Sequence, residues 1–260
     1  MRPTCCRLPW TVLLLLAGGL AFVFGQESAR EKPPAVPAAV SQVPPPPPAT
    51  WQRLSRQHDV WLDAKNKLVI VDGEICLREG QLELFACPTG TKEHEAVVSL
   101  NCIPEQVHAG LLALGARQGK PVSFDPAYRA ATGDVIDIYV TWTDEAGKQQ
   151  TARAQQWVKY AKTGKEMPFD WVFAGSGFWT DEETGKKHYQ ANAGDLICVS
   201  NFPTATLDLP VESTQANAGL LFVAFTEKIP PRGTKVRVVL TPRVKREVKE
   251  TATEERKPAP

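Results

Sequence analysis

The sequence predicts an α+β fold that is rich in β-sheet and contains two short helices. Three observations support this class: short segments in which apolar and polar residues alternate, two apolar patterns with helical spacing, and a hairpin-strand-helix-strand unit that occurs twice. About 190 residues between the two ends carry these patterns, which is enough for one large domain or two small ones.

Alternation and turn residues predict the strands. Residues 60–77 are typical of a hairpin with Asp72-Gly73 as its turn, and residues 94–100 alternate as a strand does. A second hairpin joins residues 134–142 to 149–158 through a polar turn at 144–148. A third is predicted over residues 171–190, with its turn at 182–185.

The first helix is predicted to begin at Pro104, because the N–H group that proline lacks is not needed in a first turn. Val107, Leu111 and Leu114 form its apolar stripe, and Gly115 ends it.

The second helix is predicted to start near Ser213 and Thr214, which are plausible N-caps, and to bury Ala216, Leu220 and Val223.

An internal duplication is predicted from landmarks that recur in the same order over residues 60–126 and 178–242. Residues 108–114 and 217–223 share Ala-Gly-Leu-Leu, and the strand-like segment that ends at Cys87 corresponds to the one that contains Cys198.

The N-terminus predicts export. Arg2 and Arg7 precede an apolar run over residues 8–24, so residues 1–25 are interpreted as a signal peptide with cleavage before Gln26. The protein is then periplasmic or extracellular, and an uncleaved signal would tether it to the membrane.

The remaining chain divides by composition. Residues 26–52 are predicted to be a disordered proline-rich linker, residues 53–242 the α+β domain, and residues 243–260 a charged disordered tail. Lys and Arg number 30 against 29 Asp and Glu, and no basic stripe occurs in the folded region, which argues against a nucleic-acid partner.

Cys87, His94, Glu95 and His108 are the candidate ligands for a transition metal, because a thiol, two imidazoles and a carboxylate lie close in sequence. Their spacing matches no zinc finger. A structural cluster of hydrogen-bonded residues is the alternative interpretation.

The cysteines of an exported protein are also candidates for disulfides. The candidates Cys76, Cys87, Cys102 and Cys198 allow three connectivities, and one bridge would leave two free thiols.

Tryptophans are spread over the predicted strands. They are expected either to line a carbohydrate or peptide groove or to pack in the core; they are Trp142, Trp157, Trp171 and Trp179.

Residues 76–242 resemble the YdjY-like domain, a family of largely uncharacterised bacterial proteins. The resemblance is carried by CPTGTKEHEAVV, VHAGLLALGA, GSGFWTDEETG, LICVSNFP and the second AGLL. It implies an exported protein with a proline-rich leader and no established reaction. Some relatives are labelled ferredoxin-like, but the closely spaced cysteines of an iron–sulfur cluster do not occur in this sequence.

Together these observations favour an uncharacterised exported protein whose domain has a non-catalytic binding or structural role in the cell envelope. No complete catalytic set of residues occurs in the sequence, and no particular partner is indicated beyond an envelope protein or a membrane tether. The alternative hypothesis is a metal-binding or thiol-redox protein that uses the Cys/His/Glu cluster.

Overall fold

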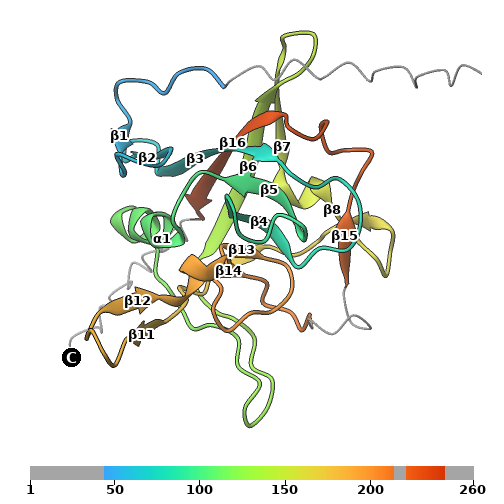
Figure 1. Cartoon of the computed structure of the whole chain (residues 1–260). Helices are drawn as coiled ribbons and strands as arrows, with labels where there is room; N and C mark the ends of the chain where they lie inside the picture. Colours follow the sequence, from blue (N-terminus) through green and yellow to red (C-terminus); the bar gives the residue numbers. More distant parts are fainter. Residues whose placement is uncertain (1–43, 214–220, 244–260) are drawn as a thin grey trace, which may run out of the picture. The chain divides into compact units, whose positions relative to one another are not determined.

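In the computed structural model of the chain, residues 44–213 and 221–243 are described (Figure 1). Within this part there is one α-helix, α1 (Pro104–Ala113), and nearly all other regular structure is β-strand. The prediction of an α+β fold with two helices is therefore wrong. The fold is a closed β-barrel with one helix packed against it.

Eight strands form the barrel. Their order around the ring is β3 (Leu68–Ile75), β16 (Lys235–Pro242), β6 (Val135–Thr143), β10 (Trp171–Phe173), β14 (Leu207–Asp208), β13 (Ile197–Cys198), β4 (Leu84–Pro88) and β5 (Ala96–Leu100). β5 then pairs with β3 and closes the ring, since Gly73 lies opposite Leu100.

The remaining strands lie outside the ring. β1 (Gln52–Arg53) and β2 (Val60–Asp63) extend the sheet beyond β3, and β7 (Gln149–Arg153) pairs with β6. Two small sheets follow. One contains β11 (Phe178–Thr180) and β12 (Lys187–Tyr189), and the other contains β15 (Phe222–Ala224), β8 (Val158–Tyr160) and β9 (Lys165–Glu166). Two short 3₁₀ helices are η1 (Ala154–Trp157) and η2 (Gln190–Ala193).

Gly73 shows why local sequence misplaced the first turn. The Asp72-Gly73 pair was predicted to be a hairpin turn, but it lies inside β3, and the chain turns instead between β2 and β3 at residues 64–67. A Cβ atom on Gly73 would lie 2.1 Å from the carbonyl oxygen of Ser99. Glycine is needed here for the close approach of β5 that closes the barrel, not for a turn.

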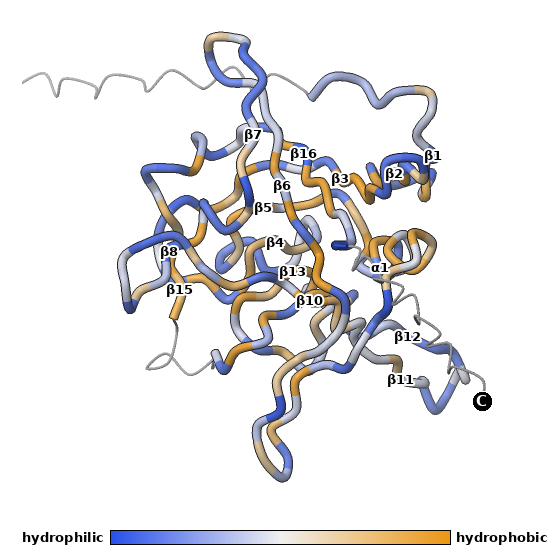
Figure 2. Tube along the Cα trace, turned by 180° about the vertical axis from the view of Figure 1, so that it is seen from behind, coloured by the Kyte–Doolittle hydropathy of each residue, from blue (hydrophilic) through white to orange (hydrophobic). Residues whose placement is uncertain are grey.

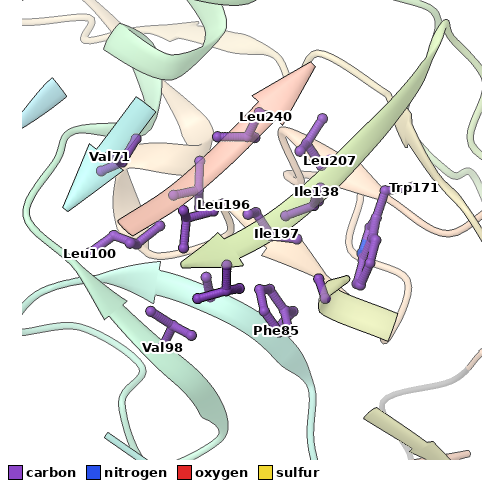
Figure 3. Close-up of a cluster of buried hydrophobic side chains, with 14 of the residues drawn as sticks. Val71, Phe85, Val98, Leu100, Ile138, Trp171, Leu196, Ile197, Leu207 and Leu240 are labelled. Carbon is purple, nitrogen blue, oxygen red and sulfur yellow. The ribbon is translucent and has the colours of Figure 1, made fainter. Parts of the chain in front are cut away.

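Side chains fill the interior of the barrel. Figure 3 shows Val71, Phe85, Ile138, Trp171 and other apolar residues pointing from different strands into one cluster, and all of these four are fully buried. In Figure 2 the hydrophobic positions concentrate along the strands, whereas the turn between β11 and β12 is hydrophilic. An eight-stranded barrel is narrow enough for side chains to occupy its centre, so the interior is a packed core.

The predicted first helix is confirmed. α1 begins at Pro104, and Val107 and Leu111 are fully buried. The helix packs against β2 and β3, and its approach is close: a Cβ on Gly110 would lie 2.9 Å from a methyl group of Val69.

The predicted second helix is not found in the part of the chain that the structure describes. Residues 214–220 lie outside the described residues, and Val223, at the end of the predicted helix, lies in β15. The two proposed repeats also differ in their pairing, because β2 and β3 belong to the large sheet whereas β11 and β12 form a separate two-stranded sheet. The parallel pairs β4–β5 and β13–β14 nevertheless occupy corresponding places in the two segments, so the duplication stays a prediction.

At the N-terminal end, the predicted signal peptide and residues 26–43 of the predicted linker lie outside the described residues, as do residues 244–260 of the predicted tail. Trp51 and Gln52, which were assigned to the linker, belong to the fold: Trp51 Nε1 donates a hydrogen bond to Asp63 at 3.1 Å, and Gln52 pairs with Leu62. Among the described residues, no helix combines the length and apolar character that a membrane span requires.

Candidate binding site

The four residues predicted as metal ligands do not converge on one point. Cys87 is fully buried in β4, whereas the side chain of His94 is 78% exposed, with Nε2 3.7 Å from Glu95 Oε2. His108 lies on α1, in a different hydrogen-bond network. Across residues 44–213 and 221–243, no group of three or more His, Cys, Asp or Glu residues is arranged to hold a metal ion.

An ammonium group lies where a metal was predicted. Lys92 Nζ is 2.9 Å from Asp195 Oδ1 and 3.7 Å from Glu95 Oε1, and it lies 4.3 Å from the centre of the Phe202 ring. Burial and the neighbouring Glu95 carboxylate raise the pKa of Glu83. The ammonium group of Lys92 thus already lies between the carboxylates of Glu95 and Asp195, where a metal ion would have to bind.

His108 is a hydrogen-bonded structural residue. Its Nδ1 lies 2.9 Å from the hydroxyl of Tyr189, which also lies 3.1 Å from Thr206 Oγ1 and donates to the carbonyl of Gly175 at 3.2 Å. Its ring packs edge-on against Phe173, and burial lowers the pKa of its imidazole. The neutral ring holds α1 against the start of η2 and the end of β12.

All four candidate disulfide cysteines are free and buried, so the described residues contain no disulfide. Cys87 and Cys198 share one apolar cluster on neighbouring strands but are not bonded. Burial raises the pKa of Cys76 to about 12 and that of Cys87 to about 11, and it also raises those of Cys102 and Cys198. Such thiols are almost wholly protonated near pH 7 and react slowly, which leaves the thiol-redox hypothesis without support.

A groove of about 470 Å³ lies beside the turn between β6 and β7. Trp142, near the end of β6, is half-buried, lines the groove and packs on Trp157 of the core with the ring centres 5.3 Å apart. Residues 143–146 form one wall and residues 227–231 the other. Figure 1 shows this turn at the top, next to the orange-red connection from β15 to β16. We call this the Trp142 groove.

The walls of the Trp142 groove carry three carboxylates and one ammonium group. Asp144 accepts hydrogen bonds from Gln150 Nε2 and two backbone N–H groups, and the Gln150 bond does most to lower the pKa of its carboxyl. Glu145 is exposed on the turn, and Glu227 is 69% exposed with only a 3.7 Å contact to Lys159. The ammonium of Lys228 is paired with Glu166 at 2.5 Å. The groove therefore combines an indole with more carboxylates than ammonium groups.

A second hollow of about 500 Å³ adjoins the Trp142 groove, because Lys228 lines both. Its other lining residues are Gly164, Lys165, Glu166 and Phe225. We call it the Phe225 hollow. Here two ammonium groups face one carboxylate, so its charge balance is opposite to that of the groove.

A further hollow of about 490 Å³ next to Pro44 is lined mainly by polar and charged residues, but its charges are already paired. Asp72 accepts two hydrogen bonds from Arg237, at 2.6 and 2.9 Å, and Glu74 is paired with Lys235. Charged groups with ion-pair partners have less to gain from a ligand, so the Trp142 groove is the stronger candidate.

One buried polar cluster was not predicted from the sequence. Asp208 on β14 is fully buried, and its Oδ1 accepts hydrogen bonds from the Leu209 N–H at 2.8 Å and Asn201 Nδ2 at 3.3 Å. Its Oδ2 has no hydrogen-bond partner in the part of the chain that the structure describes, and burial raises the pKa of this carboxyl to about 7.

The structure separates the two roles proposed for the tryptophans. Trp157 and Trp171 are core residues, Trp142 lines the groove, and Trp179 is 48% exposed on β11. The acidic residues directly after Trp142 are a sequence signal that could have located this groove, although the sequence pattern there predicted only a turn. Residues 227–231, which complete it, lie far away in the chain and carry no such signal.

The closed barrel and its packed interior define a β-barrel domain whose ligand-sized groove lies outside the barrel. The family model of the YdjY domain matches residues 60–241, more than half of the chain, and the protein therefore belongs to the YdjY domain family. Comparison with curated proteins and with solved structures gives no significant match.

Proposed function

We propose that this protein is an exported, non-catalytic binding domain of the cell envelope and that its ligand occupies the Trp142 groove. The observation that carries the proposal is the groove itself, which has a volume of about 470 Å³ and combines the Trp142 indole with exposed carboxylates on its walls. Ligand sites in proteins have volumes of about 300–1,000 Å³ and combine apolar surface with a few polar groups in this way. The arginines and apolar run of residues 1–25 support export.

A chemical role has less support. The thiols are buried with raised pKa values, and Lys92 lies among the carboxylates that a metal would need. The groove carboxylate with a shifted pKa, Asp144, is held in its charged form by hydrogen bonds, which suits binding rather than proton transfer.

Blocking the groove tests the proposal. Ala146 is exposed on the groove wall, so Ala146→Trp fills the opening without disturbing the core, and Ala64→Trp makes the same change on the exposed turn between β2 and β3. Ligand-observed NMR with the full chain would screen oligopeptides and oligosaccharides. We expect at least one class to bind the wild type and Ala64→Trp but not Ala146→Trp.

Equal binding to both variants would place the ligand elsewhere, and chemical conversion of a bound ligand would contradict the non-catalytic role. Export has its own test. The processed chain should appear in the periplasmic or extracellular fraction, and cytoplasmic accumulation would contradict that part of the proposal.

A further inference from the structure

We propose that the ligand is an extended peptide that runs from the Trp142 groove into the Phe225 hollow, with a basic side chain over Trp142 and an acidic group beside Phe225. This inference rests on the proposed function and adds the chemical class of the ligand.

The length of the site favours a peptide over a small molecule. Two hollows of about 470 and 500 Å³ meet at Lys228, so a ligand that uses both must pass this side chain. Lys228 is held in place by Glu166 at 2.5 Å and by the Phe225 ring at 4.5 Å. It therefore marks a fixed boundary between the two parts of the site.

The Trp142 end selects a positive charge. A cation that sits on an indole face is attracted by the ring quadrupole, and the attraction grows when carboxylates stand nearby. Glu145 and Glu227 are both exposed on the groove walls and can reach toward such a group. The ammonium group of Lys228 repels a bound cation only weakly, because its charge is paired with the Glu166 carboxylate.

The Phe225 end selects a negative charge. Lys165 is exposed there and Lys228 borders it, against the single carboxylate of Glu166. Lys159 also lies over the Phe225 ring, at 4.5 Å. Because one end of the site is acidic and the other is basic, a ligand with opposite charges at its two ends can bind in only one orientation. A uniformly basic or acidic ligand would be repelled at one end.

The wall between β15 and β16 indicates the backbone conformation of the peptide. Pro230 and Pro231 lack N–H groups, and the carbonyl of Pro231 already accepts from the N–H and hydroxyl of Thr234. Pro230 and Pro231 therefore cannot donate the backbone hydrogen bonds that pairing with a β-strand requires. A polyproline II segment needs no such pairing and packs well against aromatic and proline rings.

The test uses the full chain and the blocked peptide acetyl-Lys-Pro-Pro-Pro-Pro-Glu-amide. The reference peptides have glutamine in place of both charged residues, or the same charge at both ends. Isothermal titration at low salt should show the tightest binding for the dipolar peptide. Glu145→Lys and Lys165→Glu should each weaken it about fivefold, since exposed charge pairs contribute modestly.

Glu182→Lys is the matched control, because Glu182 is exposed on the turn between β11 and β12, away from the site, and takes the same charge change. It should leave the affinity unchanged. Equal weakening by Glu182→Lys would mean non-specific attraction and would overturn the proposal.

Equal affinity for the dipolar and the glutamine peptide would also overturn it. The proposed function would survive that result if another ligand class bound the groove and was displaced by Ala146→Trp. It would fail if no ligand distinguished Ala146→Trp from Ala64→Trp.

Discussion

Two buried polar clusters of this barrel differ in how completely their hydrogen bonds are made. Around His108, the Tyr189 hydroxyl contacts the imidazole, Thr206 and the Gly175 carbonyl, all within 3.2 Å. Around Asp208, one carboxyl oxygen has two donors and the other has none among the described residues.

The two clusters respond to pH in opposite directions. Burial lowers the pKa of His108 and raises that of Asp208, so both residues favour their neutral forms in the folded protein. Folding therefore becomes less favourable toward acid through His108 and toward alkali through Asp208. The His108 cluster therefore makes the fold sensitive to acid, and the Asp208 cluster makes it sensitive to alkali.

The largest expected effect is that of Asp208→Asn above neutral pH. The pKa of Asp208 is about 7 in the folded chain against 3.8 as its ordinary value, so its contribution to stability is complete below about pH 4 and is lost as the pH rises through 7. This loss is on the order of 4 kcal/mol for a shift of this size. Urea unfolding at pH 4.5 and pH 8 should show that the free energy of unfolding of the variant increases relative to that of the wild type as the pH rises. A difference that does not change with pH would contradict the assignment.

Next in size is Asn201→Ala. The Asn201 amide donates to Asp208 Oδ1 and the Leu209 carbonyl, and its oxygen accepts from the Ser213 N–H at 2.8 Å. Removing it leaves these buried groups without partners, which should lower the free energy of unfolding by about 3 kcal/mol.

Ser200→Ala is the control for that variant. The Ser200 hydroxyl is fully buried and has no hydrogen-bond partner in the described part of the chain, so its removal should change stability by less than about 1 kcal/mol. Similar losses in both variants would show that volume, and not hydrogen bonding, dominates at this cluster.

Local elements of the fold could be predicted from the sequence, but the barrel could not. Pro104 and the apolar stripe predicted α1, and alternation predicted the β6–β7 hairpin, because the determining residues are neighbours in the chain. Closure depends on Gly73 meeting the Ser99 carbonyl of another strand. In sequence, Asp72-Gly73 is indistinguishable from a turn.

The site was predictable to a similar extent. Trp142 was recognised as a residue that lines either a groove or the core, and it does both. The prediction of a metal site was wrong for two reasons that become visible only in the folded structure. The helix carries His108 toward Tyr189, and Lys92 reaches Asp195, which is distant in the chain.

A smaller effect is expected for Tyr189→Phe, which tests the satisfied cluster. The variant keeps the packing of the ring but removes the hydroxyl from His108, Thr206 and Gly175, at a cost of about 1–2 kcal/mol in the free energy of unfolding. Tyr139→Phe on β6 is the control, since no hydrogen bond of the Tyr139 hydroxyl is seen in the described residues. Thermal unfolding should separate the two variants, and equal melting temperatures would show that the Tyr189 network contributes little.

The smallest effect is that of His108→Asn in mild acid. Burial depresses the pKa of His108 below its ordinary value of 6.5, so its contribution to stability is present above pH 6.5 and is lost as the pH falls through the depressed value. Asparagine keeps a polar atom near Tyr189 but does not titrate. The wild type should therefore lose stability relative to the variant between pH 7.5 and pH 5, opposite in direction to the Asp208 effect. If the stability difference between wild type and variant stays constant over this range, then His108 accepts a proton equally well in the folded and unfolded states. That result would contradict the lowered pKa of His108 and the opposite pH responses of the two clusters.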